Sequence, residues 1–198
     1  MRTPISIIKS YIYAVKCGTI SKEFISKIDH AVCNASEILE TYIRNINNNV
    51  VLQLEIIWVQ NCIEEALKNI FLSRANTVVT VKYENIYQIK ADKLMLTQVI
   101  INILKNALEA IKLSESQQIY ISTYTNHSER FISIKDNGCG IKEENLNKIF
   151  TPFYSSKTSG VGIGLAFCKN ILEKMGAEIK CNSVYDEYTE FLIIFNNI

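Results

Sequence analysis

The chain has 198 residues, 48% of them hydrophobic, and its 21 basic and 20 acidic side chains leave a net charge of +1. This composition allows a sizeable core, and a near-neutral charge without a Lys/Arg run argues against partners such as nucleic acid or an anionic membrane. The six scattered cysteines form no CxxC pair or zinc spacing, which is typical of reduced thiols. Short apolar runs and the lack of a signal peptide predict a soluble, cytoplasmic chain that makes no membrane contact.

Residues 1–48 have the pattern of a helical hairpin. Apolar residues recur at helical spacing over 4–15, the pattern breaks at 17–19, and a longer apolar stripe runs from Phe24 to Ile46. Three consecutive asparagines at 47–49 then predict a boundary. We therefore expect a hairpin domain over residues 1–48 and a second domain over residues 49–198.

The second domain mixes strand-like and helical segments. Most strands follow one another closely and are expected to pair antiparallel, with helices inserted between them. This order favours an α+β fold, a layered sandwich with helices on one face of a mixed sheet. Strands are predicted at 50–59, 77–85, 86–91, 118–126, 130–136, 178–184 and 189–195, and helices at 60–76, 92–113, 143–149 and 161–175.

The predicted helix at 92–113 carries one thin polar stripe. At about 100° per residue, a narrow arc holds Gln98, Asn102, Lys105, Asn106 and Glu109, and apolar residues fill most of the rest. A solvent-facing stripe is the ordinary explanation. However, asparagine is a weak helix former, and two asparagines one turn apart supply amide oxygens that suit Mg²⁺ with phosphate oxygens as co-ligands.

A strand that ends at Asp136 runs directly into Asn137, Gly138, Cys139 and Gly140. An Asp-Asn-Gly sequence is common in ordinary turns. The alternative is that Asp136 forms the floor of a pocket, where its carboxylate could accept a hydrogen bond from an exocyclic amine such as that of adenine.

Residues 158–167, TSGVGIGLAF, hold three of the chain's seven glycines in front of a predicted helix. They match neither the phosphate-binding loop GxxxxGK[ST] nor the dinucleotide fingerprint, because the glycine spacing differs. Exposed N–H groups at a helix start still bind phosphate, and Lys157 lies just upstream as a point charge. A flexible loop with a weak helix cap would account for one glycine but not for three.

Taken in order, QVIINILKNALEAI, DNGCGI, FTPFYSSK and GVGIGL resemble the four sequence boxes of the sensor histidine kinase catalytic domain, over residues from about 51 to 198. That domain belongs to the ATPase superfamily of DNA gyrase, heat-shock chaperones and mismatch-repair proteins. The sequence is most similar to the nitrogen-regulator and sporulation-kinase branch. The resemblance implies ATP and Mg²⁺ as cofactors.

By this resemblance, Asn106 coordinates Mg²⁺, Asn102 lies beside the triphosphate, and Asp136 binds the adenine amine. Residues 151–160 correspond to a lid over ATP, and Thr189 supports the aspartate. Hydrolytic relatives carry Glu as general base at the Asn102 position, so the asparagine favours phosphoryl transfer over ATP hydrolysis. Lys157 is implied to act with Asn102 in catalysis, and the other positions implied to contact nucleotide are Lys105, Gly138, Gly140, Gly160, Val161, Gly162, Gly164 and Leu165.

Residues 2–4, Arg-Thr-Pro, resemble the end of the family's phosphoacceptor motif, whose histidine would stand just before Met1. Neither His30 nor His127 matches that motif. The resemblance therefore implies that this chain cannot phosphorylate itself at the usual site. We expect it to be a fragment of a cytosolic or membrane-attached kinase, or to act in trans on a partner that carries the histidine.

The expected reaction is transfer of the ATP γ-phosphoryl group to a histidine, for relay to an aspartate of a response-regulator receiver domain. The hairpin implies a homodimer, weakened because residues beyond about 35 lack a first-arm partner. Two alternatives stay open. One is a nucleotide-binding scaffold or phosphotransfer partner without kinase activity, and the other is an anti-sigma-type serine kinase, which the hairpin disfavours.

Overall fold

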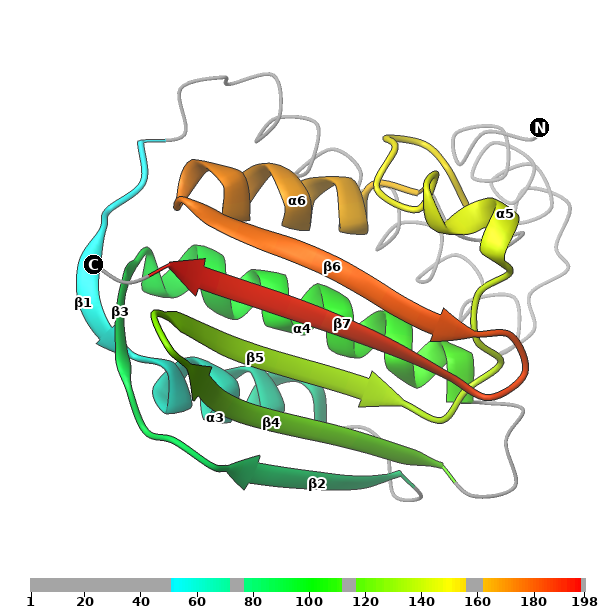
Figure 1. Cartoon of the computed structure of the whole chain (residues 1–198), viewed down its shortest axis with the longest axis horizontal. Coiled ribbons are helices and arrows are strands. Elements are labelled where there is room, and N and C mark those ends of the chain that lie inside the picture. Colours follow the sequence, from blue (N-terminus) through cyan, green and yellow to red (C-terminus); the bar gives the residue numbers. More distant parts are fainter. Residues whose placement is uncertain (1–50, 72–76, 112–116, 156–161, 197–198) are drawn as a thin grey trace, which may run out of the picture. The chain divides into compact units, whose positions relative to one another are not determined.

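The computed structural model describes residues 51–71, 77–111, 117–155 and 162–196 (Figure 1). The chain divides into two units, Met1–Val50 and Val51–Ile198, and all described residues belong to the second unit. The hairpin predicted at 1–48, and with it the predicted dimer contact, lies outside the described residues.

A five-stranded mixed sheet is the centre of the second unit. Its edge strand β2 pairs parallel with β4, and every other neighbouring pair is antiparallel. In spatial order the strands are β2 (Val78–Tyr83), β4 (Gln118–Asn126), β5 (Glu129–Asp136), β7 (Tyr188–Asn196) and β6 (Ala177–Val184). The two remaining predicted strands pair with each other in a separate small sheet, β1 (Glu55–Trp58) with β3 (Gln88–Ala91).

Three helices cover one face of the five-stranded sheet, namely α3 (Val59–Phe71), α4 (Lys93–Ala110) and α6 (Gly164–Lys174) (Figure 1). A short helix, α5 (Glu143–Leu146), lies near β6. The core forms between this helical layer and the sheet, and its fully buried side chains include Ile100, Ile103, Leu104, Ile119, Ile121, Ile132 and Ile134. The predicted α+β layered sandwich is confirmed. Within the described ranges, none of the helices has the length and apolar character needed to cross a membrane.

Helix α4 is fixed at both ends by contacts with distant parts of the chain. Asp92 is its N-cap: Oδ1 accepts a hydrogen bond from the Met95 N–H (3.0 Å), and Oδ2 accepts one from the Gln53 N–H (2.9 Å). At the other end the helix stops at Ala110, short of the predicted residue 113. The reason is tertiary, because the Ala110 carbonyl accepts a hydrogen bond from the Cys139 N–H (3.4 Å).

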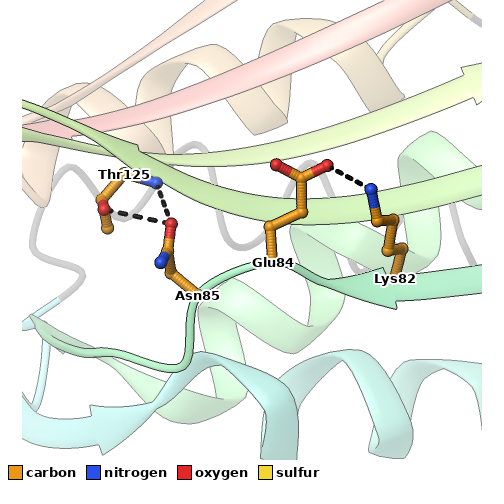
Figure 2. A network of polar contacts seen from close by, with 4 residues as sticks. All are labelled: Lys82, Glu84, Asn85 and Thr125. Carbon is orange, nitrogen blue, oxygen red and sulfur yellow. Dashed lines mark hydrogen bonds and ion pairs between the residues drawn. The ribbon is translucent and has the colours of Figure 1, made fainter.

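The parallel edge strand β2 is fastened to β4 by side chains that follow its end (Figure 2). Asn85 Oδ1 accepts hydrogen bonds from the Thr125 N–H (2.9 Å) and the Thr125 hydroxyl (3.1 Å). Lys82 and Glu84 form an exposed ion pair (2.8 Å), which contributes little because water screens it. Asn85 therefore helps to fix the register of a strand that no hairpin turn could join to its neighbour.

Candidate functional site

The polar stripe of α4 is the part of this helix that the core leaves uncovered. Gln98, Asn102 and Asn106 are half-buried, and Lys105 and Glu109 are exposed. The apolar positions between them are buried: Val99, Ile100, Ile103, Leu104, Ala107 and Leu108. The sequence therefore placed the stripe correctly on the surface of the helix.

Asn102 is oriented by a neighbour on its own helix and lies close to α6. Its Oδ1 accepts a hydrogen bond from Gln98 Nε2 (3.3 Å), one turn earlier on α4. The thiol of Cys168, which is buried in α6, donates to the Val99 carbonyl of α4 (3.7 Å) and lies near the Asn102 side chain. Burial raises the pKa of Cys168 to about 12, and the contact with Asn102 opposes that rise only partly. Asn102 therefore stands at the contact between α4 and α6.

Asp136 is the last residue of β5, and its side chain is buried at 2% exposure. Oδ1 accepts a hydrogen bond from the Gly138 N–H (2.9 Å). Thr189, 3% exposed, is the direct register partner of Asp136 on β7. Burial, together with the negative charges of Asp136 and Glu190, raises the pKa of the nearby Cys181 to about 12. Burying an ionised carboxylate costs free energy unless hydrogen-bond donors or cations pair with it, and buried carboxylates are common in binding sites.

The turn after Asp136 packs against the β6–β7 turn. Gly140 has a φ of +61°, and a Cβ added there would lie 2.1 Å from the Val184 carbonyl oxygen. The Cys139 carbonyl accepts a hydrogen bond from the Asp186 N–H (2.9 Å). By the resemblance, we expected Gly138 and Gly140 to let the chain pass close to the adenine base. In the structure the tight neighbours of both glycines are protein atoms, Ala110 for Gly138 and Val184 for Gly140.

A backbone hydrogen bond from the Phe153 N–H to the Gly162 carbonyl (2.9 Å) joins the first part of the predicted lid at 151–160 to the chain just after it. Gly162 has a φ of +73°, and a Cβ there would lie 2.3 Å from the Tyr154 carbonyl oxygen. This bond and this φ also explain why α6 begins at Gly164 and not at the predicted residue 161. Three of the predicted site residues lie outside the described residues: Lys157, Gly160 and Val161.

The N-terminus of α6 lacks a side-chain cap. Its N-cap residue, Ile163, has no side chain that could accept a hydrogen bond from the first N–H groups of the helix. Gly164 and Leu165, the first two helical residues, are half-buried. Among the described residues, a Cβ added to Gly164 would meet no atom within 4 Å beyond its chain neighbours and its own helix backbone. Packing within the described residues therefore does not explain this glycine, whereas an anion approaching the helix start would.

Residues 91–197 match the family model described as "Histidine kinase-, DNA gyrase B-, and HSP90-like ATPase". The chain belongs to this family. The matched region includes the α4 stripe, the Asp136 turn, the start of α6 and Thr189, so each part of the candidate site lies within an ATP-binding domain.

Individual members of the family are similar over different parts of the chain. The signal transduction histidine-protein kinase AtoS of Escherichia coli (strain K12) is 27% identical over 98% of this chain and 33% of AtoS. Sporulation kinase C of Bacillus subtilis (strain 168) is 39% identical over 54% of this chain and 24% of that protein. The chain thus spans at most about a third of these two relatives.

A solved structure of histidine kinase ThkA in complex with response regulator protein TrrA matches 100% of this chain and 58% of the matched chain, with 25% identity and a TM-score of 0.75. The fold and the family are therefore those of histidine kinase catalytic domains.

Sequence reasoning missed two residues that touch the candidate site. Cys168 supports Asn102 from α6, and Ser183 on β6 forms hydrogen bonds around Thr189. Neither residue stands in a pattern that would distinguish it from ordinary residues of a helix or strand. Their positions follow from helix packing and strand register, which the sequence does not display.

Proposed function

We propose that this chain is the ATP-binding catalytic portion of a two-component sensor histidine kinase. It transfers the γ-phosphoryl group of ATP to a histidine, for relay to an aspartate of a response regulator. The observation that carries the proposal is the packing of α4 against α6, where the buried Cys168 thiol donates to the Val99 carbonyl (3.7 Å). Cys168 lies about one turn into α6, so this contact brings the amide stripe of α4 close to the uncapped N-terminus of α6. The amide oxygens of the α4 stripe can bind Mg²⁺, and the uncapped N–H groups at the start of α6 can bind phosphate.

Each part of the site has a role in this proposal. The Asp136 carboxylate accepts a hydrogen bond from the exocyclic amine of adenine, beside Thr189. Asn106 supplies an amide oxygen to Mg²⁺, Asn102 lies beside the triphosphate, and Lys157 adds a positive charge from the lid. Bound Mg²⁺ would neutralise phosphate charge as the γ-phosphoryl group leaves. The backbone and side-chain contacts to the nucleotide come from Lys105, Gly138, Gly140, Gly160, Val161, Gly162, Gly164 and Leu165.

The two carboxamides fit Mg²⁺ and phosphate because they are half-buried on a rigid helix and because Asn102 is already oriented. An amide at this position cannot act as the general base that would activate water. The site therefore suits transfer to an acceptor that is brought in by another domain, with catalysis by positioning and charge neutralisation.

The acceptor histidine comes from outside the catalytic domain in this proposal. His127 lies in the β4–β5 turn with a φ of +51°, and its Nδ1 is 2.6 Å from Asn126 Oδ1. His30 lies outside the described residues. In this proposal the hairpin expected at 1–48 forms a homodimer that its short first arm weakens, and the acceptor is supplied in trans or by a longer protein, in the cytoplasm. The response-regulator partner is supported by the ThkA–TrrA complex.

Phosphoryl transfer can be tested with radiolabelled ATP, Mg²⁺ and a separately purified helical hairpin that carries the acceptor histidine of a related kinase. We expect acid-labile label on the added hairpin, and loss of that label with the variant Asn106→Ala. Asn170→Ala is the matched control, since Asn170 is an exposed asparagine on α6 outside the stripe. Nucleotide binding without transfer would support the scaffold alternative, and acid-stable label would support a serine kinase.

A further inference from the structure

Ser183 lies in one row with the two buried polar residues of the site. On β6 it is the register partner of Thr189 on β7, and Thr189 is in turn the partner of Asp136 on β5. Thr189 and Asp136 are 3% and 2% exposed, whereas Ser183 is half-buried. The three polar side chains thus follow one another across adjacent strands on the helix-covered face.

The hydrogen bonds of Ser183 determine where its single hydroxyl proton points. Oγ donates to the Tyr188 carbonyl at 2.7 Å, because that oxygen can only accept. Oγ also accepts a hydrogen bond from the Ile141 N–H at 2.8 Å. The remaining contact, at 3.1 Å to Thr189 Oγ1, needs one donor. Since the Ser183 proton is already in use, Thr189 must be that donor.

This assignment fixes the hydrogen-bonding role of the Thr189 hydroxyl. Its hydroxyl proton is directed toward Ser183, so only lone pairs remain for a ligand or a bridging water. Asp136, when ionised, also offers only acceptors. The row therefore presents acceptors alone to whatever approaches it. At position 6 of a purine, an amine supplies a donor that satisfies these groups, whereas a carbonyl there would leave buried acceptors facing one another.

We propose that Ser183 is a specificity-determining positioning residue of the nucleotide site. By holding the Thr189 hydroxyl as an acceptor, it favours a purine with an amine at position 6 over one with a carbonyl there. Through the Ile141 N–H it also fixes the end of the turn that follows Asp136. This inference rests on the proposed function, because it presumes that a purine nucleotide binds beside Asp136.

The test measures binding of two diphosphates to the full chain by isothermal titration calorimetry with Mg²⁺. ADP carries the amine at position 6, and inosine diphosphate carries a carbonyl. The wild-type chain should bind ADP more tightly. In Ser183→Ala the Thr189 hydroxyl is free to turn and donate, so the preference for ADP should fall by about fivefold or more, the effect of roughly one hydrogen bond. Ser183→Thr retains a hydroxyl and should restore the preference.

Ser133→Ala is the matched control. Ser133 is also a strand serine, but its hydroxyl donates to Glu190 (2.7 Å) on the opposite face of the sheet. This variant should retain the wild-type preference. The inference is overturned if Ser183→Ala keeps a preference for ADP within about twofold of wild type, or if Ser133→Ala loses as much of that preference as Ser183→Ala does. Either result would leave nucleotide binding itself intact. A wild-type chain that binds neither nucleotide would overturn the proposed function and this inference with it.

A double-mutant cycle separates specificity from general damage to the fold. Thr189→Val removes the hydroxyl through which Ser183 is proposed to act. In that background, Ser183→Ala should change the ratio of the two affinities by less than about twofold. If Ser183→Ala lowers the preference for ADP as much in the Thr189→Val background as in wild type, Ser183 does not act through Thr189. That result would overturn the proposal even where the single variant is less stable.

Discussion

Gly164 and Gly176 lie at opposite ends of α6 and make different demands on a side chain. A Cβ at either residue meets nothing within 4 Å. Gly176, just after the C-terminal end, has a φ of +73°, while no positive φ is found at Gly164. Replacement by alanine should therefore weaken nucleotide binding at Gly164 and lower stability at Gly176.

Gly164→Ala should fold at least as well as wild type, because alanine is the better helix former by up to about 1 kcal/mol. Its methyl group would nevertheless occupy the space through which a phosphate reaches the first N–H groups of α6. A hydrogen bond from an N–H to a charged oxygen contributes about 1.5–3 kcal/mol. We therefore expect the dissociation constant for ADP to rise by about tenfold or more.

Gly176→Ala forces alanine into the left-handed region, at a cost of about 1–2 kcal/mol. For a domain of this size, the melting temperature should fall by roughly 2–8 °C, while ADP affinity remains unchanged. Thermal denaturation without nucleotide and calorimetric titration with ADP and Mg²⁺ measure the two effects separately. If Gly164→Ala binds ADP as well as wild type, the phosphates do not approach the start of α6, and the reasoning about this glycine fails.

Three further predictions concern ionisable side chains. Asp136→Asn should fold but bind ADP at least about tenfold more weakly, because an amide N–H₂ would face the adenine amine; unchanged affinity in a direct titration would place adenine elsewhere. In a variant whose two N-terminal cysteines are replaced by serine, the exposed Cys139 should be the first thiol to react with a thiol reagent, and ADP should slow its reaction. Mass spectrometry of the labelled peptides would show whether another cysteine reacts first or whether ADP has no effect. Burial raises the pKa of both Cys168 and Cys181 from 9.0 to about 12, so their stabilising effect is complete below pH 9.0 and is lost as the pH rises toward 12. By urea denaturation, the free energy of unfolding should be about 1 kcal/mol per thiol lower at pH 10 than at pH 8, and Cys168→Ala should reduce this difference. An equal difference in the variant would contradict the assignment to Cys168.

The sequence predicted the sheet, the helices and the surface stripe of α4 because these follow from local periodicity. Helix ends were less accurate because distant residues determine them. Helix α4 ends at Ala110, whose carbonyl accepts a hydrogen bond from the Cys139 N–H. Helix α6 begins later than predicted because the Gly162 carbonyl accepts a hydrogen bond from the Phe153 N–H. The separate β1–β3 sheet likewise depends on pairing between segments that are about thirty residues apart.

The candidate site was predictable as a set of residues but not as a geometry. Asp136 and Thr189 are far apart in sequence and meet only through the β5–β7 register. The support that Cys168 gives to Asn102 depends on how two helices pack. The sequence also does not show why each glycine is needed, since a glycine required by protein packing and one left open for a ligand look identical in sequence. The structure separates Gly140 from Gly164 on this point.

The hydrogen bond between Phe153 and Gly162 joins the two ends of the segment between them. Because its two ends are already joined, a change in its length need not alter the sheet or the helices. Doubling such a loop costs only about 0.6 kcal/mol in closure entropy. The segment between residues 154 and 161 is therefore a suitable place to insert a reporter peptide.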